Sequence, residues 1–269
     1  MSDAEWAFFE PFMHSIRGRG GRPAGDHRLV LDGVFWIART GAQWRDLPAE
    51  FGKWSSVYRQ FRRWTLAGLW EMVLEALNES GAAPNQVQMI DSTVTRAIIH
   101  CPAGHCVSNV PREEAAGAKG GPPKEGFGRS KGGFTTKIHL ITNAHGLPIK
   151  AEISPGQCSD YTGYDLLQDE DLPDPKVFIA DRGYDANAIR EDVEGKGGIA
   201  IIPGRSNRKK QPFLDPFVYA LRNQIERCFN KLKNARRLAT RYDKTANSYL
   251  DFIHIVSARL WIKKFVNRT

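Results

Sequence analysis

The sequence predicts a mixed α/β protein in which helices cover the faces of a sheet and a helical domain comes first. Three observations predict this fold class. Apolar residues recur at helical spacing through residues 1–80, β-rich runs alternate with helical runs through residues 87–202, and helical spacing returns after Pro216. We therefore expect two domains, a helical one at 1–84 and a sheet-containing one at 85–269.

The helical domain is predicted to have the order helix, turn, helix. "DHRLVLDGVFWIARTG" has apolar residues at helical spacing and ends at Gly41. "AQWRDLPAEFGKW" is a short connection, and "SSVYRQFRRWTLAGLWEMVLEAL" predicts a second helix over 55–77, with Ser55 and Ser56 as N-cap candidates.

Basic residues gather on that second helix, which carries Arg59, Arg62 and Arg63. A helix, a turn and a basic helix are typical of a helix-turn-helix unit, so we expect these arginines to contact DNA. The alternative is an amphipathic helical cap whose core holds three aromatic residues, Trp54, Phe61 and Trp64.

The second domain begins with strands. "VQMIDSTV" predicts a strand, and "FTTKIHLITNA" and "LPIKAEISPG", separated by "HG", predict a hairpin. "KVFIAD" predicts a strand buried on both faces because its apolar run is continuous, and "IAIIPG" predicts a last short strand. Helices are expected at "YTGYDLLQD" and "NAIREDVEGKGG" and, after the sheet, over 217–238 and 248–266. This order gives a mixed sheet with flanking helices.

A segment at about 100–133 interrupts the strands. It is rich in glycine, proline and alanine, as in "AAGAKGGPPKEG", and such a composition predicts a mobile loop. "HCPAGHC" at its start places His100, Cys101, His105 and Cys106 at a spacing unlike that of zinc sites, so we expect no zinc there.

The charge of the chain is localised. The chain has 269 residues, a net charge of +8 and a pI near 9.4, and residues 205–244 hold twelve Lys/Arg against three Asp/Glu. That segment has a net charge of +9, so the remainder sums to −1. A concentrated positive charge favours a polyanionic partner such as nucleic acid, with a solvated face as the alternative.

Other bulk features exclude some classes. No run approaches the 18 apolar residues of a membrane span, and the N-terminus lacks the basic-then-apolar order of a signal peptide. The four cysteines do not form a disulfide framework. We therefore expect a protein of a reducing compartment with no membrane partner.

Two carboxylates follow apolar runs. Asp91 follows "VQMI" and Asp181 follows "VFIA". If these strands lie side by side, the carboxylates sit at the same level of the sheet, where burial and mutual repulsion disfavour their charges. A divalent cation such as Mg²⁺, which binds hard oxygen ligands, would neutralise them.

A third carboxylate lies in "YALRNQIERCFNKLK". On one continuous helix, Tyr219, Arg222, Glu226 and Lys233 fall within roughly 60° of one another. This face would suit a metal ligand beside a phosphate-binding surface. The alternative is a surface helix with an i,i+4 pair between Arg222 and Glu226.

With these motifs in order, the sequence resembles the DDE transposases of bacterial insertion sequences, in the insertion sequence 5 family. "MIDSTV" and "IADRGYDA" match the first two catalytic Asp motifs. Tyr219, Arg222, Glu226 and Lys233 match the family signature Y-(2)-R-(3)-E-(6)-K without a gap. "GRSKGGFTTKIHL" and the N-terminal "WRDLPAEFGKWSSVYRQFRRW" extend the resemblance over nearly the whole chain.

The resemblance implies an RNase H-like core in which Asp91, Asp181 and Glu226 are catalytic and bind two Mg²⁺ or Mn²⁺ ions. It implies cleavage of double-stranded DNA at the terminal inverted repeats of a transposon and strand transfer into target DNA, with at least two copies of the chain on the DNA. It also implies a bacterial, cytoplasmic protein. No phosphate-binding loop motif is present, so no nucleotide cofactor is expected. Two alternatives stay open: an RNase H-like nuclease without strand transfer, and a non-catalytic DNA-binding derivative.

Several further residues carry weaker expectations. Arg222 and Lys233 are expected to hold DNA phosphates, with Tyr219 beside them. Arg129 and Lys131, in a glycine-rich context, are expected to touch the DNA backbone. Lys137 and His139, two apart on a strand, share one face and either approach the site or pack on the sheet; Asp160 is a further acid near the motifs, without an assigned role.

Overall fold

The computed structural model describes residues 1–16, 25–80, 84–98, 125–131, 133–168 and 172–265. Most of the predicted loop at 100–133, with His100, Cys101, His105 and Cys106, lies outside the described residues. The part that is described, at 125–131, contains a short strand, so the loop prediction is wrong there. No helix among the described residues is long and apolar enough to cross a membrane.

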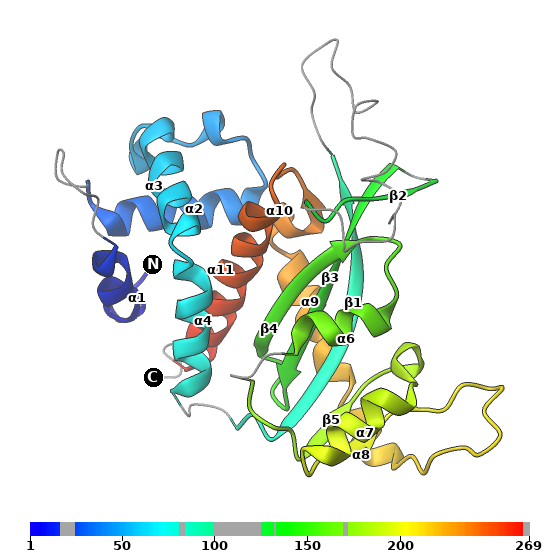
Figure 1. The fold of residues 1–269 in the computed structure, drawn as a ribbon. Coiled ribbons are helices and arrows are strands. Elements are labelled where there is room, and N and C mark those ends of the chain that lie inside the picture. The colour runs from blue at the N-terminus through cyan, green and yellow to red at the C-terminus, as the bar shows by residue number, and fades with distance from the viewer. Residues whose placement is uncertain (17–24, 81–83, 99–124, 132, 169–171, 266–269) are drawn as a thin grey trace.

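Helices make up the N-terminal region (Figure 1). They are α1 (Asp3–Ser15), α2 (His27–Thr40), α3 (Trp54–Leu66) and α4 (Leu69–Glu79), with short 3₁₀ turns η1 (Trp44–Asp46) and η2 (Ala49–Phe51) between α2 and α3. The predicted helix at 26–41 is confirmed. The Asp26 side chain caps it by accepting from two backbone N–H groups, and Gly41 ends it in the left-handed conformation at φ 68°.

The predicted helix at 55–77 is wrong in one respect, because it is two helices. The chain breaks after α3, where Gly68 has a φ of 67° that residues with a Cβ rarely adopt. The predicted caps are also wrong. Lys53 occupies the N-cap position of α3 without a side-chain hydrogen bond, and Ser55 and Ser56 lie in the first turn.

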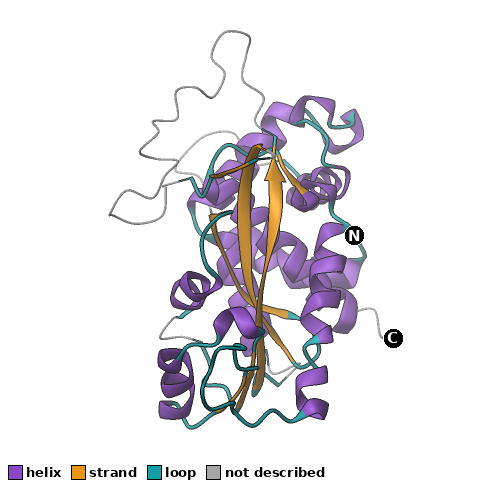
Figure 2. Cartoon of the chain, turned by 90° about the vertical axis from the view of Figure 1, so that its right-hand side faces the viewer, coloured by secondary structure: helices purple, strands orange, loops and turns teal. Residues whose placement is uncertain are grey.

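A mixed sheet lies at the centre of the molecule (Figure 2). Within the described residues, seven strands form it in the order β2-β3-β1-β5-β6, with β4 paired to β3 and β7 paired to β1. The strands are β1 (Val87–Ala97), β2 (Gly128–Ser130), β3 (Gly133–Asn143), β4 (Pro148–Pro155), β5 (Val177–Ile179), β6 (Ile199–Ile201) and β7 (Thr240–Arg241). β3 and β4 form the predicted hairpin, antiparallel like β1 and β3, whereas β5 and β6 run parallel to β1.

Helices cover both faces of the sheet, as predicted. Because successive strand residues point to opposite faces, neighbours along β1 join different cores. Met89 packs into a core with α9 (Asn223–Lys233) and α11 (Ala246–Phe265), and Ile90 packs into a core with α6 (Asp160–Leu167) and α7 (Asn187–Gly195). Side chains of β1 therefore point alternately to an α9 face and an α6 face.

The helix predicted over 217–238 is also interrupted. It consists of α8 (Pro216–Ala220), α9 and α10 (Arg236–Ala239), followed directly by β7. Between α8 and α9, the N–H groups of Leu221 and Arg222 donate to the carbonyls three residues earlier, which forms a tighter turn than an α-helix. The prediction that Tyr219 and Glu226 lie on one continuous helix is therefore wrong.

The N-terminal helices pack against α11. The rings of Phe61 and Phe252 stack with centroids 4.9 Å apart, and one hydrophobic cluster continues from α1–α4 into α9 and α11. On its other side, α11 is tied to β4, because Trp261 Nε1 donates to the carbonyl of Pro148 at 2.7 Å.

Candidate active site

The parallel pairing of β1 and β5 brings two carboxylates together. Met89 is the register partner of Ile179. Asp91 follows Met89 by two residues and Asp181 follows Ile179 by two, so the two aspartates lie at the same level of the sheet. They share one face, because side chains alternate along a strand. Asp181 lies just beyond β5, where its Oδ1 accepts from the Gly183 N–H at 2.8 Å at the start of a 3₁₀ turn, η3 (Arg182–Tyr184). The predicted neighbourhood of the two strands is confirmed.

Helix α9 brings the third carboxylate to the same face. Arg222, at its N-terminal end, donates from Nη2 to Asp91 Oδ2 at 2.8 Å and from Nη1 to Glu226 Oε1 at 2.6 Å. The i,i+4 pair offered as the alternative for Glu226 is therefore present, but it is part of a bridge to the sheet. The side chains of Asp91 and Glu226 are 14% and 51% exposed, so the site runs from the sheet to the surface.

The remaining two signature residues lie beside these groups. Lys233 Nζ donates to Thr93 Oγ1 at 2.6 Å, and Thr93 follows Asp91 by two positions on the α9 face of β1. Tyr219 is partly buried, and burial raises the pKa of its hydroxyl, which also senses the charges of Arg222 and the carboxylates. All four signature residues thus lie near the middle of β1, around Asp91 and Thr93.

The electrostatics of Asp91 are unusual for a carboxylate. Burial raises its pKa to about 6, Arg222 opposes that rise, and the negative charges of Asp181 and Glu226 add to it. Asp181 and Glu226 are therefore close enough to Asp91 to disfavour its ionisation. A cation beside Asp91 would favour its charged form.

Within the described residues, no three His, Cys, Asp or Glu side chains form a ready-made metal site. Arg222 lies between two of the three candidate ligands and supplies the positive charge there. The donor set nevertheless fits Mg²⁺ or Mn²⁺, since all three ligands offer hard carboxylate oxygens and Asp91 is buried at the cost of its charge.

Arg129 and Lys131 are not brought to this site. Arg129 is exposed on β2, and its guanidinium lies over the ring of Phe134. Phe134 is six residues before Leu140, the register partner of Asp91, so about 20 Å of strand separates them.

The arginines of α3 also lie away from β5 (Figure 1). Arg59 and Arg63 are exposed, and they bond the Ser55 carbonyl and the Gln60 side chain of their own helix. Arg62 is partly buried and donates to Ser248 of α11 at 3.0 Å.

Some basic side chains of the segment 205–244 are buried. Arg237 and Arg241 are 4% and 0% exposed. Arg237 pairs with Asp243, and Arg241 donates to Thr136 and lies over the ring of Phe127 at 3.7 Å. These two arginines hold the fold together, so the polyanion-binding charge of the segment rests on its other members.

The site also contains residues that sequence reasoning missed. Ser92 donates its N–H to Asp91 Oδ1 and its hydroxyl to Asp160 on α6. Lys137, one of the two residues whose placement was open, bonds the same carboxylate, whereas His139 is buried against Ser154. The alternation of β1 was the available signal, because it sends Ser92 to the face opposite Asp91.

Comparisons with known proteins identify the family of the chain. The family model "Putative transposase of IS4/5 family" matches residues 1–74, and "Transposase DDE domain" matches residues 84–261. The "Putative transposase for insertion sequence element IS6501" of Brucella ovis is 35% identical over 134 residues, which is 48% of this chain and 100% of that relative. "Uncharacterized protein y4sN" of Sinorhizobium fredii is 36% identical over 101 residues, which is 37% of this chain and 78% of that relative.

Solved structures were also matched. The Mos1 strand transfer complex aligns at 11% identity and a TM-score of 0.25, over 93% of this chain and 81% of that chain. A Mos1 mariner paired end complex with Mn aligns at 13% identity and a TM-score of 0.26, over 97% and 86%. The DDE domain match spans well over half of the present sequence, and the predicted mixed sheet with flanking helices is confirmed. The chain belongs to the transposase DDE domain family.

Proposed function

We propose that this chain is a transposase that cuts DNA at transposon ends and joins those ends to target DNA by metal-dependent phosphoryl transfer. One observation carries the proposal. The middle of β1, the turn after β5 and the N-terminal end of α9 bring Asp91, Asp181 and Glu226 into one electrostatically coupled group. Three carboxylates on a rigid sheet and helix suit the binding of a divalent cation next to DNA.

Asp91, Asp181 and Glu226 would hold Mg²⁺ or Mn²⁺, two ions in the expected arrangement. When bound, the metal supplies Lewis acidity that activates the attacking oxygen and stabilises the leaving oxygen of an in-line displacement. The Asp91 side chain is more buried than that of Glu226, so it would form the inner edge of the site.

The basic signature residues would hold the DNA. Arg222 offers two nitrogens that now bond carboxylates, and its planar fork suits the bidentate binding of a phosphate. Lys233, beside Thr93, would hold a second phosphate as a point charge. Tyr219 lies beside them and would position the strand. The reaction conserves phosphodiester bonds, so it requires no nucleotide cofactor.

Partners follow from the reaction. Double-stranded DNA at terminal inverted repeats and target DNA are the substrates, and two element ends held together require at least two copies of the chain. Arg59, Arg62 and Arg63 of the helical region, with Arg129 and Lys131 on and beside β2, would bind DNA away from the chemistry. A bacterial cytoplasm is where such a protein would act.

The test uses the purified chain with its native element ends, target DNA and Mg²⁺. Asp91→Asn, Asp181→Asn and Glu226→Gln are compared with Asp165→Asn, which alters an exposed carboxylate on α6. We expect end cleavage and joined products for the wild type and the control, and neither for the three site variants. Cleavage without joining would favour a nuclease. DNA binding without cleavage, identical in all five proteins, would indicate a non-catalytic derivative.

A further inference from the structure

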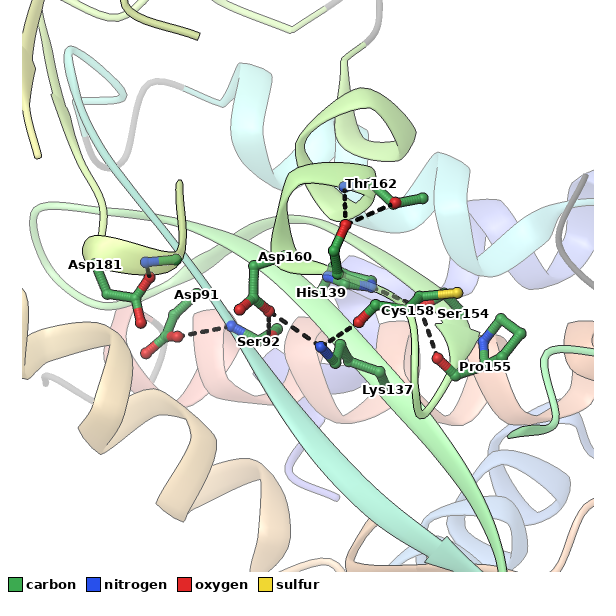
Figure 3. A network of polar contacts seen from close by, with 12 residues as sticks. Asp91, Ser92, Lys137, His139, Ser154, Pro155, Cys158, Asp160, Thr162 and Asp181 are labelled. Atoms are coloured by element: carbon green, nitrogen blue, oxygen red, sulfur yellow. Dashed lines mark hydrogen bonds and ion pairs between the residues drawn. The ribbon is translucent and has the colours of Figure 1, made fainter. Parts of the chain in front are cut away.

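A second polar cluster lies behind the carboxylate site, on the α6 face of the sheet (Figure 3). Asp160 Oδ1 accepts from Ser92 Oγ at 2.5 Å and from Lys137 Nζ at 3.2 Å. The Asp160 and Lys137 side chains are 29% and 12% exposed, so this ion pair is largely shielded from water. The cluster joins α6 to two neighbouring strands.

The strand register explains this arrangement. On β1, Asp91 points to the α9 face and the next residue, Ser92, points to the α6 face. Ser92 is opposite His139 on β3, and Lys137 is two residues before His139, so all three side chains share the α6 face. Asp160 is the first residue of α6, the helix that packs on this face, and Ser159 is the N-cap of that helix.

Asp160 also abuts the loop that carries Asp181. A Cβ on Gly183 would lie 2.7 Å from Asp160 Oδ2 and 2.9 Å from Asp181 Oδ1. A side chain at position 183 would therefore collide with both carboxylates, and glycine lets them approach this backbone closely. The N–H of Gly183 donates to Asp181, just as the N–H of Ser92 donates to Asp91.

Asp160 thus bonds Ser92, the residue after Asp91, and lies against Gly183, two residues after Asp181. We propose that Asp160 is a positioning residue, which fixes Asp91 through Ser92 and Asp181 through Gly183 and so sets the separation of two metal ligands. This inference rests on the proposed function. Lys137 forms an ion pair with Asp160, so Asp160 adds no unpaired negative charge behind the carboxylate site.

Hydrogen bonding, not charge, is the property that this role requires. Asp160→Asn keeps an oxygen that accepts from Ser92 and Lys137, whereas Asp160→Ala removes it. Ser92→Ala removes the hydroxyl bond to Asp160, keeps the backbone N–H bond to Asp91, and leaves the charge of every carboxylate unchanged. Ser159→Ala is the matched control, because it removes the N-cap bond to Thr162 in the same helix turn without touching Asp160 contacts.

Two measurements test the role. Mn²⁺ binding is followed by electron paramagnetic resonance with the protein on a pre-cleaved DNA end, where no reaction occurs, and single-turnover cleavage is measured on intact ends over a range of Mg²⁺ concentrations. Ser92→Ala and Asp160→Ala should weaken Mn²⁺ binding about tenfold and raise the Mg²⁺ concentration for half-maximal rate similarly. Asp160→Asn should lie near the wild type, as should Ser159→Ala, and DNA affinity should not change.

The positioning role is overturned if Ser92→Ala and Asp160→Ala bind Mn²⁺ like the wild type, or if Ser159→Ala weakens binding equally. It is also overturned if Asp160→Asn is as damaging as Asp160→Ala, because the charge itself would then be the active property. In each case the wild type still binds metal and cuts. A wild type that does neither refutes the proposed function, and the inference with it.

Discussion

Arg222 and Asp91 are 131 positions apart in sequence, yet Nη2 of the arginine lies 2.8 Å from Oδ2 of the aspartate. The contact joins the N-terminal end of α9 to the central strand of the sheet. Since the same guanidinium also bonds Glu226, one side chain holds together two of the three carboxylates. A positive charge is therefore already placed where the proposed chemistry brings phosphate and metal.

Arg222→Lys should impair catalysis although it keeps the charge. One ammonium group cannot reproduce two hydrogen bonds from a planar fork, and charge-assisted bonds contribute about 1.5–3 kcal/mol each. We expect the single-turnover cleavage rate to fall by about tenfold to a hundredfold. Arg227→Lys, an exposed position on the same helix, is the control and should retain the wild-type rate. Equal rates for both variants would show that the fork of Arg222 is not needed.

The buried pair of Arg237 and Asp243 should stabilise the fold only as a pair. Its two bonds are 2.6 and 2.9 Å long and its side chains are 5% and 6% exposed. Arg237→Ala leaves a buried carboxylate without its partner, so we expect a loss of about 3–5 kcal/mol in the free energy of unfolding. Urea denaturation measures it. The double variant Arg237→Met, Asp243→Leu should lose less than Arg237→Ala alone, and a larger loss would contradict this account.

Asp251 should make the stability depend on pH. Burial raises its pKa to about 7, and Arg62 partly opposes the rise. The unfolded chain ionises this group near 3.8, so the stability gained by keeping it protonated is fully present below that pH and is lost as pH rises through 7. The shift corresponds to about 4 kcal/mol at pH 8.

Asp251→Asn removes this dependence. Its gain in unfolding free energy over the wild type should be near zero below pH 4, grow between pH 4 and 7, and stay constant above. Urea unfolding at several pH values measures it. Glu10→Gln, which alters an exposed carboxylate on α1, should show no such growth. A gain for Asp251→Asn that does not change with pH would mean that folding does not raise the pKa of Asp251.

Much of the site could be predicted from sequence because strand geometry is regular. An apolar run that ends in aspartate, repeated on two strands, was enough to place Asp91 beside Asp181. The signature spacing then located Arg222 and Glu226. The position of Tyr219 relative to them was not predicted correctly, since α8 and α9 are separate helices joined by a tight turn.

The remaining errors have local causes. The break at Gly68 in the helix predicted over 55–77 could have been predicted from sequence, because a glycine within a helical pattern marks a possible helix end. No glycine or proline marks the turn at Leu221 and Arg222, where packing of α9 on the sheet overrides helical propensity. Arg237 and Arg241 counted toward a basic surface because composition does not reveal which charges are buried.

Gly163 gives a last prediction, in which propensity and packing have opposite signs. It lies inside α6, where alanine would normally favour the helix by about 1 kcal/mol. However, a Cβ at this position would lie 2.0 Å from Nδ1 of His139, and that ring is held by Ser154 through a 2.7 Å contact. The buried imidazole has no room to move away, and burial lowers its pKa to about 4.

Gly163→Ala should therefore destabilise the protein by about 1–3 kcal/mol, the usual effect of overpacking, and urea denaturation measures it. Gly195→Ala is the control at the end of α7, where nothing lies within 4 Å of the added methyl group, and it should be neutral or slightly stabilising. Because Asp160 begins the same helix, Gly163→Ala should also reduce the single-turnover cleavage rate. If Gly163→Ala were as stable and as active as the wild type, α6 would have to shift freely on the sheet, which would contradict its role as the rigid support of Asp160.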